Sequence, residues 1–461
     1  MRYFIHQAHE ANDTIAAIAT PPGEGGIAVI RISGKHALHI ANAIFSGDVY
    51  SYPSHSVHFG KMLEKRDGDA IDSGLLLVLR APRSFTGEDT VEMQCHGGPL
   101  IAQKILQAAL DAGARAAEPG EFTFRAFRNG KLDLAQAEAV QQCISAKSDL
   151  ALQAAEAQLE GHLSTKIHAF QKELTECAAI VEAYIDFPDD DLPTNSKEEL
   201  CQRLGTIVTE MHSLAATFHE GRLLRMGPML SIVGPPNVGK SSLMNALLRK
   251  NRAIVTDIPG TTRDLIEEEC ALGSFHVRLV DTAGIRATEE VVEREGIRRA
   301  ELALKESDLI LLVLDAHVPY STDIKSLIET LPKARTLLLW NKVDLPHADL
   351  PSLDFSRTLH ISAMTGMGLD SLKTAISECL QREVFLGSRE EILLTKERHY
   401  RALCDAQSAL EKAIQGLLEN AFFEIIALNM RFALSSLGTI LGTDITEDIL
   451  SAIFSQFCIG K

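Results

Sequence analysis

The stretch Gly234-Pro-Pro-Asn-Val-Gly-Lys-Ser241 decides the fold, because it directly follows the apolar run Met229–Val233. Its spacing is that of a phosphate-binding loop between a strand and a helix. The glycines let backbone N–H groups turn toward phosphates, and Lys240 can reach the terminal ones. The Ser241 hydroxyl is suited to ligate Mg²⁺. A chance surface turn is the alternative, but a lysine aimed into an empty glycine loop has no evident structural use.

Four further segments follow in the order that a guanine-nucleotide switch requires: Gly260-Thr-Thr-Arg-Asp264, Asp281-Thr-Ala-Gly284, Asn341-Lys-Val-Asp344 and Ser362-Ala363. The first offers a hydroxyl for Mg²⁺, and the second offers a carboxylate for the metal and a glycine N–H that senses the γ-phosphate. The Asp344 carboxylate can accept from guanine N1–H and N2–H₂, which adenine lacks, and the last segment offers a backbone contact to O6. The five segments predict a GTP-binding α/β domain of the Ras-like, doubly wound type.

The hydrolytic part departs from small signalling GTPases, which carry a water-orienting glutamine after the second segment. Ile285 stands there instead, so a polar residue elsewhere has to take that role. The residues that follow are rich in acid: Glu289, Glu290, Glu293 and Glu295. Arg263 and Arg286 are the nearby candidates for an arginine finger, although switch-loop arginines are more often solvated or salt-bridged.

Composition limits the possible partners. The 461 residues suggest about two to four domains. The net charge of −17 argues against broad non-specific binding to nucleic acid, which depends on lysine and arginine. Aromatic residues make up only 5% of the chain, so a base-stacking platform for single strands is not expected. An RNA substrate would need a basic partner or a local basic patch.

The eight cysteines form no Cys-x-x-Cys pair and no zinc spacing, and we expect most of them to be buried small hydrophobes in a reducing cytosol. The N-terminus shows no signal pattern, and no apolar run approaches about 18 residues. The sequence therefore predicts a soluble, cytoplasmic protein without a membrane partner.

The chain before the phosphate-binding loop shows two patterns. Short strands, turns and one helix over residues 13–117 predict a small α+β module. A helical period then predicts long amphipathic helices over 131–186 and another over 196–225. The strands expected in the first module are Thr14–Ala19, Gly26–Ile32, Ile71–Leu79 and Thr90–Gln94, and its helix is Ile101–Ala112.

The second half alternates strand and helix over Met229–Cys379, which predicts a mainly parallel sheet, and then becomes helical. The later strands are expected at Leu309–Leu314, Leu337–Trp340 and Leu359–Ile361, and the final helices at Lys396–Leu418, Ala421–Leu437 and Thr446–Phe457. The simplest arrangement inserts the switch domain between two halves of one helical domain, so that its loops can move those helices. Two independent helical caps are the alternative.

Motifs along the whole chain resemble those of the MnmE (TrmE) family of tRNA-modifying GTPases. The phosphate loop is generic, so the N-terminal segments and the tail make the resemblance specific. These motifs are Asp13-Thr-Ile15, Ala19-Thr-Pro-Pro-Gly23, Ile30-Arg-Ile-Ser-Gly34, Ser84-Phe-Thr-Gly-Glu88, His96-Gly-Gly98, Pro119-Gly-Glu-Phe122, Lys131-Leu-Asp-Leu-Ala-Gln-Ala137, Asp186-Phe-Pro188, Thr256-Asp-Ile-Pro-Gly-Thr-Thr-Arg-Asp264 and Phe457-Cys-Ile-Gly-Lys461.

The resemblance implies a multidomain homodimer with a folate-binding, dimerising α+β domain over 1–125. An all-α helical domain would span 126–226 and 384–461, with the GTPase domain inserted at 227–383. With a flavin-dependent partner, MnmG, in a heterotetramer, such proteins add an aminomethyl or carboxymethylaminomethyl group at C5 of the wobble uridine in certain tRNAs. The implied cofactors are GTP, Mg²⁺, K⁺ and 5-formyl- or methylene-tetrahydrofolate.

The resemblance also assigns roles to single residues around GTP. The implied metal ligands are Ser241 and Thr262 for magnesium, and Asn237, Thr256, Ile258 and Thr261 for potassium. The potassium ion would occupy the arginine-finger position, and Glu293 would position the water, with Lys240 as the second catalytic residue. The residues expected at the nucleotide are Asn237, Val238, Gly239, Lys240, Ser241, Ser242, Thr256, Asp257, Ile258, Pro259, Gly260, Thr261, Thr262, Asp281, Thr282, Ala283, Gly284, Asn341, Lys342, Val343, Asp344, Ser362, Ala363 and Met364.

Arg31, Glu92, Lys131 and Lys461 match the folate-contacting positions of the family. A carboxylate such as Glu92 can read the amide-like edge of a pterin, and the anionic glutamate tail suits Arg31 or lysines. From the residues alone, Arg31 and Glu92 could equally be ordinary strand residues. Cys458 is either a thiolate nucleophile or a structural or pocket residue.

Two other functions stay open at this point. A ribosome-assembly GTPase would carry a basic RNA-binding domain after the switch domain, and the acidic helical C-terminus argues against it. A non-enzymatic switch would need neither the folate-like residues nor the closing Cys458-Ile-Gly-Lys461. His96 is likewise either a satisfied structural histidine or a base.

Overall fold

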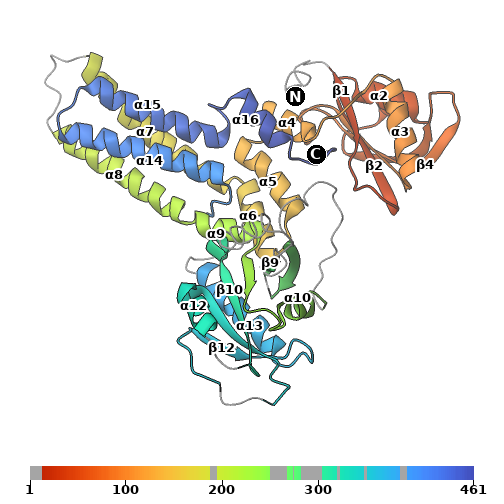
Figure 1. Ribbon diagram of the computed structural model, residues 1–461. Helices are drawn as coiled ribbons and strands as arrows, with labels where there is room; N and C mark the ends of the chain where they lie inside the picture. Colours follow the sequence, from red (N-terminus) through yellow and green to blue (C-terminus); the bar gives the residue numbers. More distant parts are fainter. Residues whose placement is uncertain are drawn as a thin grey trace, which may run out of the picture. The chain divides into compact units, whose positions relative to one another are not determined.

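The computed structural model describes residues 13–186, 195–249, 267–273, 275–281, 304–318, 322–346, 350–384 and 392–461. The chain forms two units, and Figure 1 colours it by residue number, so that the segments of each unit can be located. The first unit lies within Met1–Ser145, Ala155–Ser213 and Arg398–Lys461, and the second within Ala146–Ala154 and Leu214–Glu397.

The first unit contains a six-stranded sheet in the order β3-β4-β5-β2-β1-β6. Its strands are β1 (Thr14–Ile18), β2 (Gly25–Gly34), β3 (Ser56–Leu63), β4 (Ala70–Leu79), β5 (Thr90–Gly97) and β6 (Arg115–Ala116). Helices α2 (Ala37–Ile44) and α3 (Pro99–Asp111) pack on one face, where alternate strand residues such as Ile30, Ile32 and Met93 join their core. The predicted α+β module is therefore present, but the prediction of one helix is wrong, because the eight-residue α2 also packs there.

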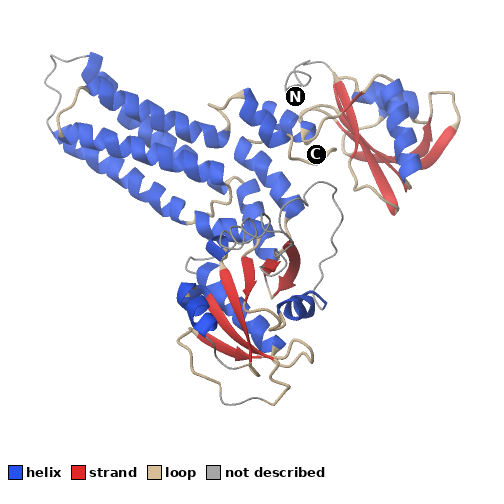
Figure 2. Ribbon diagram, in the orientation of Figure 1, coloured by secondary structure: helices blue, strands red, loops and turns tan. Residues whose placement is uncertain are grey.

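The same unit contains the long helices, drawn blue in Figure 2. They are α4 (Glu121–Arg128), α5 (Leu134–Ser145), α7 (His162–Asp186), α14 (Glu397–Leu418), α15 (Phe423–Leu441) and α16 (Glu447–Phe454), together with most of α8 (Asn195–Ala216) and residues 155–159 of α6 (Asp149–Leu159). The single helix predicted over 196–225 is instead two, because α8 ends at Ala216 and α9 (Phe218–Met226) begins after Thr217. The Thr217 hydroxyl donates to the Leu214 carbonyl at 2.7 Å, which satisfies an acceptor at the end of α8.

Among the residues that the structure describes, only α15 is long and apolar enough to cross a membrane by length and composition. It packs against α7 and α5, and its buried residues include Met430, Leu437 and Ile440. Arg431 on its outer side pairs with Glu182 of α7 at 2.5 Å. The helix is therefore a core element of the helical bundle.

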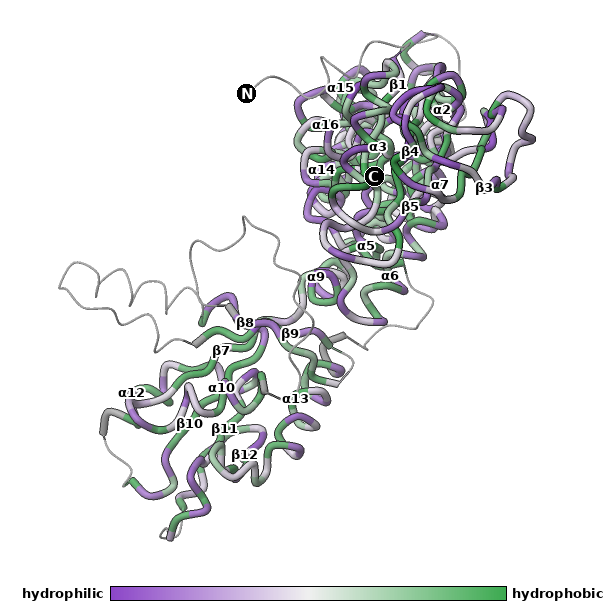
Figure 3. Tube along the Cα trace, turned by 90° about the vertical axis from the view of Figure 1, so that its right-hand side faces the viewer, coloured by the Kyte–Doolittle hydropathy of each residue, from purple (hydrophilic) through white to green (hydrophobic). Residues whose placement is uncertain are grey.

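The second unit contains a six-stranded sheet in the order β12-β11-β10-β7-β9-β8. Its strands are β7 (Met229–Val233), β8 (Glu267–Leu272), β9 (Phe275–Asp281), β10 (Leu309–Asp315), β11 (Thr336–Asn341) and β12 (Arg357–His360), and its helices include α10 (Lys240–Arg249), α12 (Thr322–Thr330) and α13 (Leu369–Val384). All neighbouring strands are parallel except β8 and β9, which confirms the predicted mainly parallel sheet. Apolar cores lie on both faces, and β7, β10 and β11 are accordingly buried along their whole length and mainly apolar (Figure 3).

The prediction that most of the cysteines would be buried is wrong. Cys95, Cys177 and Cys270 are buried, Cys458 is exposed, and the other four are partly exposed. Those four lie at the margins of the packed faces of α5, α8, α13 and α14. None of the eight forms a disulfide, in agreement with the spacing of the cysteines in the sequence.

Candidate functional site

The phosphate-binding loop connects β7 to α10, and two of its glycines are required by close backbone packing. Gly234 has a φ of +154°, and a Cβ there would lie 2.1 Å from the carbonyl oxygen of Val313. Gly239 has a φ of +96°, and a Cβ there would lie 2.4 Å from Nδ2 of Asn341. Any larger side chain would push the loop away from β10 and β11, so the motif is fixed by sterics as well as by phosphate chemistry.

Lys240 begins α10 and is held against its own loop. Its ammonium donates to the carbonyls of Gly234 at 2.8 Å and Pro235 at 2.7 Å, and the residue is only 7% exposed. Ser241 and Ser242 follow in the first turn of the helix with exposed side chains. The loop therefore places a cation and two hydroxyls at a helix N-terminus, an arrangement that suits phosphate and its metal.

The buried Asn341 side chain connects the phosphate loop to the predicted base-binding segments. Its Nδ2 donates to the Val238 carbonyl at 2.8 Å, and its Oδ1 accepts from the Ala363 N–H at 2.9 Å. In the segment predicted to contact guanine O6, the Ala363 N–H is thus bonded to Asn341. This side chain fixes the spacing between the loop and Ser362-Ala363.

Lys342 crosses the same edge of the sheet. Its ammonium donates to the Asn237 carbonyl at 2.8 Å and pairs with Asp315 at 2.6 Å. Val343 is partly exposed, and Asp344 and Met364 are exposed at this edge, where a base can reach them. The structure therefore brings the phosphate-loop, Asn-Lys-x-Asp and Ser-Ala segments together at the carboxyl ends of β7, β11 and β12, the usual ligand edge of such sheets.

Several predicted residues lie outside the described part of the chain. They are Thr256, Asp257, Ile258, Pro259, Gly260, Thr261, Thr262, Thr282, Ala283, Gly284, Ile285 and Glu293, with the finger candidates Arg263 and Arg286. Asp281 ends β9 opposite Ile232 of β7, so its backbone reaches the same edge of the sheet.

A second polar site lies on the face of the N-terminal sheet opposite α2 and α3. Arg31 of β2 and Glu92 of β5 are directly paired in register, and Arg31 Nε donates to Glu92 Oε1 at 2.8 Å. Both side chains are mostly buried, with 16% and 17% exposure. The Arg31 guanidinium also lies 5.6 Å from the centroid of the Phe122 ring, which is fully buried in α4. Sequence reasoning missed Phe122 as a partner, although it ends the quoted motif Pro119-Gly-Glu-Phe122.

The C-terminal tail completes this second site. Arg31 Nη1 donates to the Gly460 carbonyl at 3.0 Å, and the Gly120 N–H donates to the Cys458 carbonyl at 3.3 Å. Gly460 has a φ of +92°, and a Cβ there would lie 2.6 Å from the Ile18 carbonyl oxygen. The glycine of the closing motif is therefore required for the tail to lie against β1.

Lys461 brings a second cation to Arg31. Burial lowers the pKa of the Lys461 ammonium from its ordinary value, and the neighbouring Arg31 lowers that pKa further. Glu92 and Cys458 oppose this shift. Two cations thus lie near the carboxylate of Glu92, an arrangement that suits an anionic ligand.

The fourth predicted folate residue, Lys131, lies by a different segment. Its ammonium donates to the Pro82 carbonyl at 3.2 Å, and its side chain contacts the turn at Gly87. The structure thus gathers Arg31, Glu92 and Lys461, and places Lys131 at the loop that precedes β5.

The sequence left two possible roles, structural or chemical, for each of His96 and Cys458. His96 is exposed, and its Nδ1 lies 2.8 Å from Asp72, whose carboxylate also accepts the His96 N–H at 2.8 Å. Burial raises the pKa of Asp72, but the hydrogen bonds and charge of His96 lower it by more, so the net shift is downward. The histidine is therefore held by a structural partner. The exposed Cys458 lies beside the second site through its backbone contact.

Comparisons with known proteins place the chain in a family. A family model described as the MnmE helical domain matches residues 134–458, and one described as the GTP-binding protein TrmE N-terminus matches residues 14–131. The tRNA modification GTPase MnmE of Protochlamydia amoebophila is 50% identical over 99% of this chain and 100% of its own length. That of Chlamydia caviae is 48% identical over 98% of this chain and 99% of its own length.

Similar solved structures include a variant of Aquifex aeolicus Era bound to GDP.AlF4-, with 26% identity, a TM-score of 0.28, and 39% of this chain and 66% of that chain covered. The G domain of the T. maritima FeoB iron transporter shows 27% identity and a TM-score of 0.24 over 33% of this chain and 99% of that chain. The full-length relatives decide the assignment: the chain belongs to the MnmE family of tRNA modification GTPases.

Proposed function

We propose that this protein hydrolyses GTP to drive the modification of C5 of the wobble uridine in certain tRNAs, together with an MnmG-type flavoprotein. A tetrahydrofolate bound at the Arg31 site would supply the one-carbon unit. The products would be aminomethyl or carboxymethylaminomethyl uridines. The single observation that carries this proposal is that one chain holds a phosphate-binding loop and a second cationic site, at which Arg31 contacts the chain's own C-terminal tail.

The nucleotide half of the proposal is supported by groups that fit a triphosphate and its metals. The exposed Ser241 hydroxyl stands at the N-terminus of α10, where Mg²⁺ would be held together with Thr262. Asn237 has an exposed side chain with an amide oxygen, a hard donor that suits K⁺. The remaining proposed potassium ligands, Thr256, Ile258 and Thr261, lie outside the described residues. When bound, the two cations would neutralise charge that develops on the phosphates.

Within the protein, Lys240 would orient the terminal phosphates from a position fixed by two carbonyl contacts. Glu293 would position the attacking water, a role that Ile285 cannot fill. Asp344 would select guanine through its carboxylate, and Asn341 would hold the phosphate and base segments at a constant distance.

The folate half is supported by charge and shape. The pair Arg31 and Glu92 offers a donor edge and an acceptor edge side by side, which suits an amide-like pterin ring. Lys461 and Lys131 would face the anionic glutamate tail. Because Lys461 shares a half-buried site with Arg31, an incoming carboxylate relieves the repulsion between them.

We also propose a homodimer that forms through the face of the N-terminal sheet opposite α2 and α3, and the four-part domain division given above. Phe59 and Leu75 are paired across β3 and β4, and both are exposed, as is Val57. These apolar residues lie on the same face as Arg31 and Glu92, because Val57, Leu77, Glu92 and Arg31 form one cross-strand row. Phe59→Glu should convert the dimer to a monomer in sedimentation; an unchanged mass would place the interface elsewhere.

Two binding and rate measurements test the proposed function. GTP turnover should be faster in potassium than in sodium at equal ionic strength, and equal rates would remove potassium from the mechanism. Deleting residues 458–461 should weaken the binding of 5-formyltetrahydrofolate in calorimetry while GTP turnover persists. Unchanged folate affinity would refute the assignment of the tail to the pocket.

A further inference from the structure

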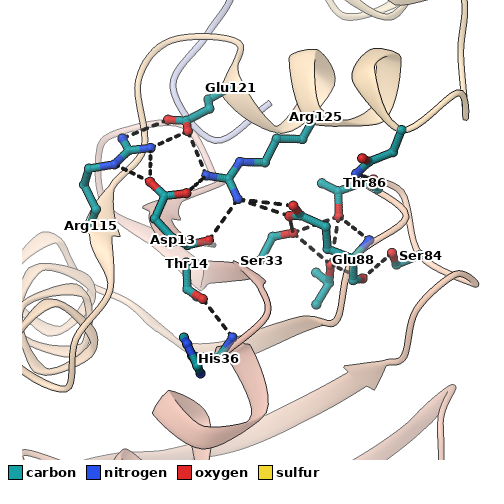
Figure 4. A network of polar contacts seen from close by, with 12 residues as sticks. Asp13, Thr14, Ser33, His36, Ser84, Thr86, Glu88, Arg115, Glu121 and Arg125 are labelled. Atoms are coloured by element: carbon teal, nitrogen blue, oxygen red, sulfur yellow. Dashed lines mark hydrogen bonds and ion pairs between the residues drawn. The ribbon is translucent and has the colours of Figure 1, made fainter. Parts of the chain in front are cut away.

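A buried polar network joins α4 to the loop that precedes β5 (Figure 4). The Arg125 side chain is only 5% exposed and reaches three carboxylates. Its Nη1 lies 3.3 Å from both oxygens of Glu88, and its Nη2 lies 2.5 Å from Asp13 Oδ1 and 3.0 Å from Glu121 Oε1. Burial lowers the pKa of Arg125, but the three carboxylates raise it by more. The guanidinium is therefore a fixed positive centre inside the domain.

Glu88 connects this centre to the strand that carries Arg31. The Ser33 hydroxyl donates to Glu88 Oε2 at 3.0 Å and lies 2.8 Å from the Thr86 hydroxyl. Ser33 and Thr86 are both completely buried. Ser33 lies two positions after Arg31 on β2, so a contact that holds Ser33 also holds the strand that carries Arg31. The Ser84–Glu88 loop is thereby anchored to β2.

The other side of the same loop touches Lys131. Asn129 Nδ2 donates to the Thr86 carbonyl at 2.7 Å, and Lys131 Nζ donates to the Pro82 carbonyl at 3.2 Å. Gly87 has a φ of +78°, and a Cβ there would lie 3.4 Å from Lys131 Cγ. The loop therefore bridges the strand of Arg31 and the segment of Lys131.

We propose that Arg125, acting through Glu88, is a positioning residue that holds Arg31 and Lys131 at a constant separation for an anionic folate. This inference rests on the folate site proposed above. Arg125 itself is buried among carboxylates and does not face the ligand. The same helix α4 supplies Phe122 beneath Arg31, so one rigid element sets the place of both ligand cations.

Glu88→Gln is the sharpest test, because it keeps the volume and an acceptor for Ser33 but removes the charge that faces Arg125. The dissociation constant for 5-formyltetrahydrofolate should rise about tenfold. In a double-mutant cycle, Lys131→Ala should cost less affinity in the Glu88→Gln background than in the unaltered protein, since both act through one loop. Hydrogen exchange of the 83–88 amides should quicken, while potassium-dependent GTP turnover stays unchanged.

Arg115→Gln is the matched control. Arg115 belongs to the same network, with contacts of 2.7 Å to Asp13 and 2.5 Å to Glu121 at the end away from the loop. The Arg115→Gln substitution should lower the melting temperature of the protein. Folate affinity and the hydrogen exchange of the loop amides should stay near those of the unaltered protein. Equal affinity in Glu88→Gln, additive losses in the cycle, or an equal affinity loss in Arg115→Gln would each overturn the inference. Absence of folate binding by the unaltered protein would instead refute the proposed ligand, and the inference with it.

Discussion

Arg31 and Gly460 are 429 positions apart, yet Arg31 donates to the Gly460 carbonyl at 3.0 Å. The contact makes the end of the chain part of a site on the N-terminal sheet. Gly120 holds the same tail through the Cys458 carbonyl, and Phe457 packs with Phe454 and Phe124. The tail therefore lies against Arg31, and under the proposed function changes in it should affect folate binding before they affect nucleotide binding.

Gly460→Ala should impair the proposed folate site without affecting the nucleotide site. The new methyl group would lie 2.6 Å from the Ile18 carbonyl oxygen in a left-handed backbone conformation, so the tail has to move. We expect at least about a tenfold loss of folate affinity, equal to about 1.4 kcal/mol, measured by calorimetry. Gly205→Ala in α8, where a Cβ meets no neighbouring atom, should leave that affinity unchanged. Normal binding by Gly460→Ala would show that the tail does not shape the pocket.

The lowered pKa of Lys461 predicts a pH dependence. The ammonium attracts the anionic ligand, so affinity should fall as the pH rises through that pKa, which lies below 10.5. Binding should in turn favour the protonated form and take up protons in this window. Folate titrations at increasing alkaline pH will measure the slope. Lys461→Arg, which keeps its charge, should flatten the curve, and an unchanged slope would assign the titration to another group.

Asp344→Asn should change the base that the protein prefers. The carboxylate accepts from guanine N1–H and N2–H₂, whereas an amide can donate to the O2 of xanthine. We expect GTP affinity to fall by about 100-fold and xanthosine triphosphate to bind more tightly than GTP. Competition with a fluorescent GTP analogue measures both. Retained GTP preference would mean that the exposed Asp344 does not read the base.

Glu293→Ala should abolish most GTP turnover while GTP affinity stays close to that of the unaltered protein. The reason is that Ile285 cannot orient water, so the acid would act only in hydrolysis. Single-turnover rates and equilibrium binding separate the two quantities. Lost binding would make Glu293 a structural residue, and an unaffected rate would remove it from catalysis.

The sequence could predict those parts of the fold that local pattern dictates. The run Leu309–Leu314 appears as β10, since a strand covered on both faces has to be apolar throughout. β3 was missed because Val57 and Phe59 are exposed and its alternation therefore did not indicate a buried strand. The phosphate loop was predictable from its glycines, each of which the packing requires.

The second site could be named from sequence only by resemblance. Nothing local in β2 shows that Arg31 meets Glu92, the Phe122 ring and a carbonyl at the far end of the chain. The Arg125 network was equally hidden, because its five charged residues come from four separate segments, and only Glu121 and Arg125 share a helix. Polar contacts between residues far apart in the sequence leave no periodic sequence pattern. Their geometry can therefore be read only from the folded structure.

Reconstitution with the flavoprotein partner is the most direct test of the account. Purified protein, partner, unmodified tRNA, GTP, potassium and a tetrahydrofolate one-carbon donor would be combined, and the wobble nucleosides analysed by mass spectrometry. The account predicts a C5-substituted uridine in the complete mixture and its loss when GTP is replaced by a non-hydrolysable analogue or the folate is omitted. An unchanged yield of modified uridine after either substitution would contradict it.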